Sequence, residues 1–330
     1  MSDHLFKDSF ERQFYYLRLS ITDVCNFKCT YCLPDGYQSN GIKPSTFLTL
    51  SEIKNTVSAF AQCGTNKVRI TGGEPSLRKD FTRIIDVVAN TEGINKVATT
   101  TNGYRMTSQV SDWQQAGLTH INVSLDSLEP HDFMRITGQN RFHDVMKGID
   151  KALSIGYEQI KVNVVLLKNY NSHQLNSFLH WIKDNPIQLR FIELMQTGEM
   201  NDYFKTHHVS GVSIRNQLIA NGWLLKPSAH DAGPAQVFFH PDYQGEIGLI
   251  MPYEKGFCSS CNRLRISSLG KLHLCLFGEE GQSLRHLMTH QSDQPALIEQ
   301  IQALLSTKKQ THLLHEGNAG ATPHLASIGG

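Results

Sequence analysis

Three cysteines lie within eight residues near the start of the chain, at Cys25, Cys29 and Cys32. Thiolates are soft ligands that bind zinc, copper(I) and iron–sulfur centres. A cubane cluster normally takes four thiolates, but no further cysteine follows for thirty residues. The spacing C-x₃-C-x₂-C therefore predicts a cluster with one iron left open to bind and polarise a small molecule. The alternative is a structural zinc site that takes a distant fourth ligand.

A second group of three cysteines stands near the end of the chain, at Cys258, Cys261 and Cys275. It also lacks a fourth cysteine, although His273 is near enough to complete a Cys3His zinc site. The C-x₂-C pair is common to zinc and iron–sulfur proteins, so the spacing leaves both metals open. The remaining cysteine, Cys63, falls in an expected helix and is interpreted as a small buried core residue.

Basic residues interrupt several apolar strands. Arg18 and Arg69 each stand between two apolar residues, and Lys161 opens a further strand. A parallel strand covered on both faces has little room for unpaired charge, so these cations predict a shared polyanionic ligand. Arg263 and Arg265 would share a face if extended, and arginine suits bidentate contacts with phosphate. The alternative is that each arginine pairs with a buried carboxylate.

These residues need a sheet to position them, and strand and helix signals alternate after residue 15. Six strands are predicted, at 16–21, 67–71, 97–101, 120–125, 161–167 and 188–194. Helices are predicted between and after them, at 51–64, 81–88, 143–155 and 174–183. Thr49 and Glu52 have the spacing of a capping box at the start of the first helix. Such repeats predict an α/β fold with a parallel sheet, whose chemistry lies at the C-terminal ends of the strands. Six strands are too few to close an eight-stranded barrel, so we expect an open, partial (β/α)6 barrel of the TIM type.

The pattern changes after about residue 225. The stretch 226–234 has the proline and glycine content of a linker, and strand-like pieces follow at 236–240 and 245–251. Short amphipathic helices are expected at 284–288 and 296–305. We therefore predict two domains, residues 1–225 and a smaller cluster-bearing domain at 226–330, in line with a prior of about 150 residues per domain.

Composition narrows the function classes. The 330 residues carry 31 lysines and arginines against 30 aspartates and glutamates, a formal net charge of +1. This balance argues against broad binding to nucleic acid or a membrane surface. The polar N-terminus has no apolar signal region, and no apolar run approaches the ~18 residues of a membrane span. We expect a cytoplasmic protein.

The motif C-x₃-C-x-Tyr-Cys after a first strand, with Tyr31 before the last cysteine, resembles the radical S-adenosylmethionine (SAM) superfamily. In that superfamily the open iron of a 4Fe–4S cluster chelates SAM, which one electron cleaves to a 5′-deoxyadenosyl radical. The resemblance implies that Cys25, Cys29 and Cys32 hold this cluster. It also implies that Gly73, in Gly-Gly-Glu-Pro, offers its carbonyl to SAM while Glu74 supports the loop. Further SAM contacts are implied at Tyr31, Ser124 and Met195, although the last two alone suggest plain strand-end residues.

Within the superfamily, Cys-x₂-Cys-Asn-Arg-Leu-Arg, a cysteine thirteen residues on and a terminal Gly-Gly resemble the GTP 3′,8-cyclases over nearly the whole chain. This implies a second 4Fe–4S cluster on Cys258, Cys261 and Cys275, where the purine of GTP binds. It implies GTP contacts at Arg18, Arg69, Thr100, Lys161, Arg263, Leu264 and Arg265. Because the tail of that family enters the active site, catalytic roles are implied for Arg263, Arg265, Gly329 and Gly330. Without the resemblance, the terminal Gly-Gly would be interpreted as a disordered end of the chain.

The resemblance implies radical cyclisation of GTP to (8S)-3′,8-cyclo-7,8-dihydroguanosine 5′-triphosphate, the first step of molybdenum cofactor biosynthesis. It implies SAM and two 4Fe–4S clusters as cofactors, an external low-potential electron donor, a downstream cyclic pyranopterin monophosphate synthase and a homodimer. One alternative is a radical SAM peptide maturase with an auxiliary cluster, a class that generally carries more C-terminal cysteines. Another is a non-enzymatic iron–sulfur electron carrier, in which the barrel and the strand-borne cations would be idle.

Overall fold

The computed structural model describes residues 5–39, 41–197, 200–227, 233–321, 326 and 328. In this part of the chain, strands β1–β6 and the helices around them alternate as the sequence predicts. The strands span Tyr16–Ser20, Lys67–Thr71, Lys96–Thr101, His120–Ser124, Gln159–Leu166 and Ile187–Glu193. The helices are α1 (Leu50–Gln62), α2 (Phe81–Ala89), α3 (Met106–Gln115), α4 (Pro130–Thr137), α5 (Phe142–Ser154), α6 (Leu175–Lys183), α7 (Asn201–His207) and α8 (Val212–Ala220).

The later part of the chain contributes further strands and one long helix. The strands are β7 (Leu224–Leu225), β8 (Gln236–Phe239), β9 (Glu246–Ile250), β10 (Arg263–Ile266), β11 (Lys271–His273) and β12 (Gln282–Ser283). Helix α9 covers Gln294–Leu305, close to its predicted bounds, whereas the helix expected at 284–288 is a single 3-10 turn at Arg285–Leu287. No helix among the described residues is long and apolar enough to span a bilayer.

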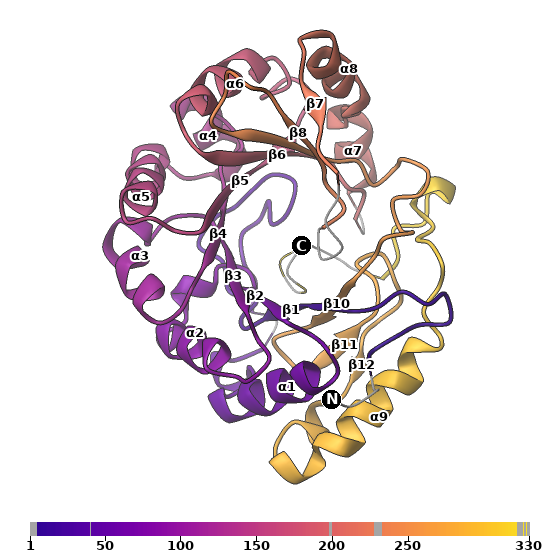
Figure 1. Ribbon diagram of the computed structural model, residues 1–330. Coiled ribbons are helices and arrows are strands. Elements are labelled where there is room, and N and C mark those ends of the chain that lie inside the picture. Colours follow the sequence, from indigo (N-terminus) through magenta and orange to yellow (C-terminus); the bar gives the residue numbers. More distant parts are fainter. Residues whose placement is uncertain are drawn as a thin grey trace.

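All described strands form one sheet in the order β12-β11-β10-β1-β2-β3-β4-β5-β6-β9-β8-β7. Strands β1–β6 run parallel, as predicted, and two late strands extend this arrangement, because β10 pairs parallel to β1 and β9 pairs parallel to β6. The sheet curves around a central space with helices α1–α6 outside it (Figure 1). Since β12 and β7 remain its two ends, the fold is an open α/β barrel.

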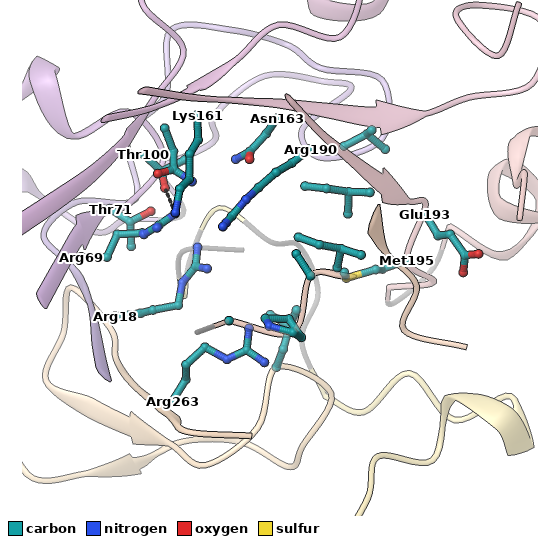
Figure 2. A pocket seen from close by; sticks show the side chains of 18 of the residues that line it. Arg18, Arg69, Thr71, Thr100, Lys161, Asn163, Arg190, Glu193, Met195 and Arg263 are labelled. Atoms are coloured by element: carbon teal, nitrogen blue, oxygen red, sulfur yellow. Dashed lines mark hydrogen bonds between the residues drawn. The ribbon is translucent and has the colours of Figure 1, made fainter. Parts of the chain in front are cut away.

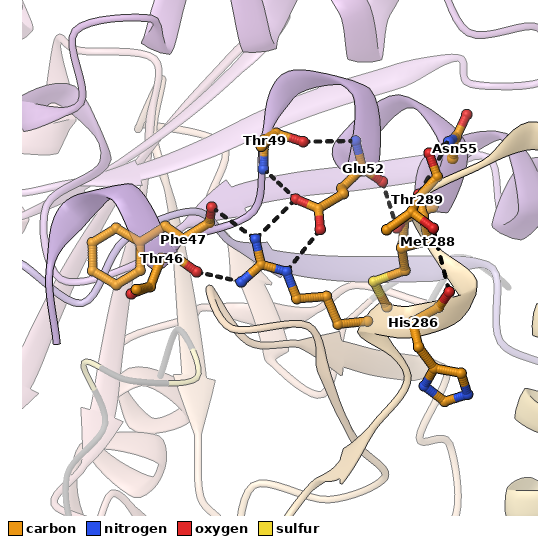
Figure 3. A network of polar contacts seen from close by, with 10 residues as sticks. Thr46, Phe47, Thr49, Glu52, Asn55, His286, Met288 and Thr289 are labelled. Atoms are coloured by element: carbon orange, nitrogen blue, oxygen red, sulfur yellow. Dashed lines mark hydrogen bonds and ion pairs between the residues drawn. The ribbon is translucent and has the colours of Figure 1, made fainter.

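The late segment is fastened to the first helix by a polar network (Figure 3). The predicted capping box is present: Thr49 Oγ1 accepts from the backbone N–H of Glu52 (3.2 Å), and Thr49 N–H donates to Glu52 Oε2 (2.7 Å). The Arg285 guanidinium donates to both carboxylate oxygens of Glu52, at 2.7 and 3.0 Å, and also to the carbonyls of Thr46 and Phe47. The same carboxylate therefore caps α1 and holds the segment that follows β12.

The hydrophobic core lies between the sheet and the outer helices. Ile53, Val57 and Phe60 of α1 are fully buried, as their helical spacing predicts. Cys63 is buried in the same core, which confirms its interpretation as a packing residue. Four helices, α3, α4, α7 and α8, were not anticipated from the sequence. The expected domain boundary after residue 225 stays a prediction, and the sheet is continuous across that point.

Candidate active site

The inner face of the curved sheet surrounds a cavity of about 990 Å³. Alternate side chains of β1–β6, β9 and β10 line it, because alternation along a strand sends every second residue to one face. Lysines and arginines outnumber aspartates and glutamates on its wall by ten to four. The six clustered cysteines all border this one space: Cys25, Cys29, Cys32, Cys258, Cys261 and Cys275.

The first cysteine loop follows β1 at the C-terminal edge of the sheet. Its backbone is tied to the end of α4, where Lys28 N–H donates to Thr137 O and Thr30 N–H donates to Ile136 O, both at 2.9 Å. Cys29 O accepts from two N–H groups farther along the loop. These bonds fix the positions of the cysteines through the protein backbone itself.

The chemistry of the first group fits a positively charged metal centre. Burial raises the pKa of Cys25 to about 12 and that of Cys29 well above its usual value, and the neighbouring thiols raise both further. All three thiols, Cys25, Cys29 and Cys32, border the same cavity. A metal centre offsets burial and repulsion by binding them as thiolates.

Neither cysteine group has the geometry of a single-ion site. In the described part of the chain, no three His, Cys, Asp or Glu side chains converge as the ligands of one metal ion would. Iron–sulfur clusters hold several irons, and cysteine thiolates bind at separate corners.

The structure shows the polar partner of Tyr31, which the sequence does not indicate. Tyr31 Oη donates to Asp126 Oδ2 (2.8 Å), while Asp126 Oδ1 accepts from Val165 N–H (2.8 Å). Burial raises the pKa of Asp126 to about 6. The hydroxyl of Tyr31 is thus engaged in holding the loop against β5.

The Gly-Gly-Glu-Pro segment packs directly beside the chain that leads into the cysteine loop. Gly73 N–H donates to Thr22 O (2.9 Å), and a Cβ on Gly73 would come within 2.4 Å of Val24 O, so only glycine fits. Glu74 is fully buried and accepts from Thr101 Oγ1 (2.8 Å) and Asn102 N–H (2.6 Å). Gly73 borders the cavity, whereas Glu74 stands behind it as an anchor.

Ser124 and Met195, at the C-terminal ends of β4 and β6, both border the cavity. Figure 2 shows the Met195 side chain directed into it, whereas the nearby Glu193 carboxylate points away from the cations. Glu193 accepts from Gly211 N–H (2.6 Å) and Ser210 Oγ (3.1 Å), so it anchors the start of α8. Sequence reasoning placed Ser124 and Met195 at this edge but did not notice Glu193.

The predicted cations converge. Register places Arg18 of β1 directly between Arg265 of β10 and Arg69 of β2. Figure 2 shows Arg18, Arg69, Lys161 and Arg263 directed into the same part of the cavity. Arg69 Nη1 donates to Thr100 Oγ1 (3.3 Å). Among the described residues, neither Arg69 nor Lys161 has a carboxylate partner within 4.0 Å, contrary to the alternative of buried ion pairs.

The cations repel one another. Burial, followed by the charges of Arg190 and Arg69, lowers the pKa of Lys161 to about 5. Burial and the charge of Arg263 lower the pKa of Arg265 to about 10. Because arginine keeps its charge at physiological pH, the lowered values measure how unfavourable this crowding is. A polyanion bound among these groups relieves it.

Sequence reasoning missed Arg190 and Lys67. Arg190 on β6 stands between Leu189 and Phe191, the same pattern that drew attention to Arg18, so the signal was available. Its side chain reaches the cavity beside Asn163 (Figure 2), and burial with the charge of Arg69 lowers its pKa to about 9. Lys67 opens β2 and also lines the cavity.

The second cysteine group borders the same cavity as the first but has different electrostatics. Burial alone would raise the pKa of Cys258, but hydrogen bonds from the His312 side chain and backbone lower it to about 7. Burial also acts on Cys261, but the charges of Arg263 and Lys308 lower its pKa below the usual value. Basic groups therefore favour thiolates at this site.

Two residues that the sequence suggested as ligand contacts near the second group, Leu264 and His273, do not border the cavity. The Leu264 side chain is fully buried in the core, so only its backbone can approach a ligand. His273 does not border the cavity, and its ring lies against Gly281, where an added Cβ would come within 2.4 Å of Nε2. The described geometry thus does not bring His273 into a Cys3His site.

The C-terminal tail reaches the cation cluster. Arg265 Nη1 donates to the carbonyl of Ile328 (3.1 Å), and Ile328 is only 3% exposed. Gly329 and Gly330, predicted to act in the active site, lie outside the described residues. The bond from Arg265 nevertheless brings the preceding residue to the cavity that the six cysteines border.

Solved structures share this architecture at low sequence identity. SuiB of Streptococcus suis superposes with a TM-score of 0.61 at 13% identity, over 85% of this chain and 67% of that chain. Its SAM-bound form gives 0.60 at 14% identity, over 80% and 61%. The family model of the Radical SAM superfamily matches residues 19–182. The protein is therefore a radical SAM protein, a class that uses SAM and an iron–sulfur cluster.

Comparison with curated proteins is more specific. The GTP 3′,8-cyclase of Vibrio parahaemolyticus is 70% identical over 98% of this chain and 97% of its own. The enzyme of the same name from Haemophilus influenzae is 60% identical over 98% and 96%. The family model Molybdenum Cofactor Synthesis C matches residues 187–314. The chain belongs to the GTP 3′,8-cyclase family.

Proposed function

We propose that this protein cyclises GTP between C3′ of the ribose and C8 of guanine, the first step of molybdenum cofactor biosynthesis. The observation that carries the proposal is the single cavity bordered by both cysteine groups and by cations from neighbouring strands. Family membership at 60–70% identity supports the reaction. The product is (8S)-3′,8-cyclo-7,8-dihydroguanosine 5′-triphosphate.

Cys25, Cys29 and Cys32 would hold a 4Fe–4S cluster at one side of the cavity. SAM bound there supplies, on one-electron reduction, the radical that removes the 3′ hydrogen of GTP. The protein's own part is to hold SAM, with the Gly73 carbonyl for its amino group and with Tyr31, Ser124 and Met195 as further contacts. Glu74 keeps the Gly73 loop in place through its buried hydrogen bonds.

Cys258, Cys261 and Cys275 would hold a second 4Fe–4S cluster, which receives the guanine base. Triphosphate and ribose would lie between the clusters on Arg18, Arg69, Thr100, Lys161, Arg263, Arg265 and the Leu264 backbone. Cations held before the ligand arrives stabilise it without reorganising. Enclosure within the barrel excludes water from the reacting centre. Gly329 and Gly330, which follow Ile328 in the sequence, would position GTP or an arginine.

The proposal also includes an electron donor, a downstream enzyme, an oligomeric state and a division into domains. An external low-potential electron donor would supply two electrons per turnover, one to cleave SAM and one, with a proton, to complete the 7,8-dihydro product. Cyclic pyranopterin monophosphate synthase would take that product. The chain acts as a homodimer, with a barrel domain at 1–225 and a cluster domain at 226–330.

The decisive experiment is anaerobic incubation of the iron-loaded protein with SAM, a reductant and GTP, followed by mass spectrometry of the products. We expect 5′-deoxyadenosine and an isomer of GTP. With 3′-deuterated GTP the isomer should lack that deuterium, because a carbon-bound 3′ hydrogen does not exchange with water. Deuterium in 5′-deoxyadenosine identifies the abstraction site. SAM cleavage without any new guanine product would refute the cyclase proposal.

The rival functions predict different spectra. In a peptide maturase or an electron carrier, added GTP leaves the spectrum of the C-terminal cluster unchanged. In the cyclase, GTP bound at the open iron perturbs that spectrum.

A further inference from the structure

A series of hydrogen bonds leads from the protein surface to Arg190, one of the cations of the cavity. Arg190 Nε donates to Gln188 Oε1 (3.0 Å), two residues earlier on β6. Gln188 Nε2 donates to Glu246 Oε2 (2.8 Å), and the register of β6 and β9 places these two residues side by side. Lys226 Nζ donates to the other oxygen of the same carboxylate (2.7 Å). Four side chains from three parts of the chain are thus connected in one line.

The chemistry of its two partners fixes how the Gln188 amide is turned. A guanidinium only donates and a carboxylate only accepts, so the amide oxygen faces Arg190 and the amide nitrogen faces Glu246. Burial would raise the pKa of Glu246, but hydrogen bonds from Lys226 and Gln188 lower it, so this residue is a carboxylate at neutral pH. Gln188 is only 8% exposed. Its amide therefore has one orientation that satisfies both partners.

A neutral amide between Glu246 and Arg190 orients the cation without neutralising it. Glu246 is paired instead with Lys226, whose side chain is 54% exposed to solvent. Among the residues that the structure describes, the Arg190 side chain has no ion pair and no hydrogen bond besides the one to Gln188. It is held through Nε, and both terminal nitrogens are left for a ligand. Figure 2 shows this side chain extending from β6 into the cavity.

Strand β9 also leaves room for the aliphatic part of the Arg190 side chain. Gly248 stands beside Arg190 in the register of the two strands. A Cβ on Gly248 would approach Arg190 Cγ to 3.1 Å, closer than ordinary van der Waals contact. The later part of the chain therefore guides Arg190 twice, through the space at Gly248 and through the carboxylate that fixes Gln188.

We infer that Gln188, fixed by Glu246, is a positioning residue that directs the terminal nitrogens of Arg190 toward a phosphate group in the cavity. The inference rests on the proposed function, since it takes a polyanion as the ligand. The paired nitrogens of a guanidinium suit a bidentate contact with phosphate. An arginine that is already oriented loses little side-chain freedom when the ligand binds, which lowers the cost of association.

The test is calorimetric titration of full-length, iron-loaded protein with two probes, GTP and inorganic triphosphate. Gln188→Met keeps the length of the side chain but removes both hydrogen bonds of the amide. We expect about 3- to 10-fold weaker binding of both probes. Gln300→Met, at an exposed position on α9, is the matched control and should bind both probes as the wild type does.

A double-mutant cycle separates positioning from a purely structural role. If Gln188 acts through Arg190, Gln188→Met should cost little further affinity in a protein that already carries Arg190→Leu. Gln188→Glu keeps an acceptor for Arg190 Nε but should also weaken binding of both probes, because a carboxylate at this position neutralises the cation. Wild-type affinity in Gln188→Glu would contradict the role given to the neutral amide.

A second variant keeps the test decisive if Gln188→Met does not fold. Glu246→Met releases the amide nitrogen of Gln188 and should weaken binding of both probes by less. Wild-type affinity in these variants, or an equal loss with and without Arg190, would overturn the inference while leaving the function intact. A wild type that binds inorganic triphosphate but forms no cyclised product would overturn the function alone. A wild type that does not bind inorganic triphosphate would overturn the inference.

Discussion

Basic side chains crowded in the cavity are the main feature at the scale of single residues. Arg18, Lys161 and Arg190 come from three different strands, and burial together with neighbouring positive charge lowers the pKa of each. Such an arrangement disfavours the empty protein and favours the complex with a polyanion. Binding and stability should therefore respond in opposite directions when one of these cations is removed.

The variant Arg190→Leu tests whether nucleotide binding and protein stability change in opposite directions. We expect GTP affinity to fall roughly 10- to 100-fold, because a charged hydrogen bond of about 1.5–3 kcal/mol is lost. We expect the melting temperature of the nucleotide-free protein to rise, because a repelled charge is replaced by an apolar side chain. Arg141→Gln, at an exposed ion pair, is the matched control and should change neither value. A lowered melting temperature together with unchanged affinity would show that Arg190 is a structural residue.

Lys161 makes nucleotide binding pH-dependent. Its pKa of about 5 leaves it neutral near pH 7 in the empty protein, and a bound polyanion raises that pKa. GTP binding should therefore take up as much as one proton, measured by calorimetry in two buffers of different ionisation enthalpy. Lys161→Met should abolish the uptake, whereas exposed Lys147→Met should not.

The same shift affects folding. The folded pKa of Lys161, about 5, is below its ordinary value of 10.5, so the unfolded chain binds more protons between these values. The contribution of Lys161 to stability therefore becomes more favourable as pH rises through that window. A wild-type stability advantage over Lys161→Met that shrinks with rising pH would contradict this.

At the scale of elements, local pattern predicted β1–β6 well because each is a short apolar run with turn residues beside it. Helix α3 was missed although Met106, Val110 and Trp113 are buried at helical spacing, because polar residues dilute the pattern. The pairing of β10 with β1 and of β9 with β6 could not be predicted, since no local signal records contacts between distant segments. For the same reason the six cysteines could be named but not brought together.

Glu52 supports two elements at once, so its replacement should be costly. Glu52→Gln keeps the size of the side chain but loses the carboxylate that receives both Arg285 and the cap of α1. We expect the free energy of unfolding to fall by about 1.5–3 kcal/mol in a urea titration. Asp144→Asn, which removes only an exposed ion pair at the start of α5, should unfold as the wild type does. Equal unfolding midpoints for both variants would mean that the network adds nothing measurable.

At the scale of the whole molecule, the two cysteine groups share one cavity but differ in surroundings. Burial, to which the charges of Glu74 and Asp126 add, raises the pKa values of Cys25 and Cys29. In the second group, His312 lowers the pKa of Cys258 and Arg263 lowers that of Cys261, in both cases against the effect of burial. The sequence indicated two similar metal sites. The contrast depends on residues from many elements, which only the fold brings together.

The iron content of the protein gives the number of clusters per chain. Anaerobically purified protein should hold about eight irons per chain, as two cubanes require. Cys275→Ala should hold about four and retain partial SAM cleavage while losing the cyclised product. Stoichiometric zinc together with a single cluster in the wild type would show that the second cysteine group binds zinc.

Deletion of Gly329 and Gly330 should separate activity from stability. Two glycines add almost no buried side-chain area, so folding, both clusters and SAM binding should persist. Activity should be lost, because a misplacement of about 1 Å at a reacting centre can lower the rate about 10²-fold. A peptide of the same terminal sequence should restore it. Full activity of the shortened chain would identify the tail as dispensable.

The parallel pairing of β10 with β1 has a consequence for synthesis. At roughly 5–20 residues per second, a ribosome completes β10 some 10 to 50 s after β1 has been made. Until then, one edge of β1 has no neighbour, and Arg18 lacks Arg265 beside it. A nascent chain can thus complete neither the barrel nor the second cysteine loop before its last hundred residues emerge. The complete site can therefore form only after β10 has emerged, and in the interval the open edge of β1 is exposed to pairing with other chains.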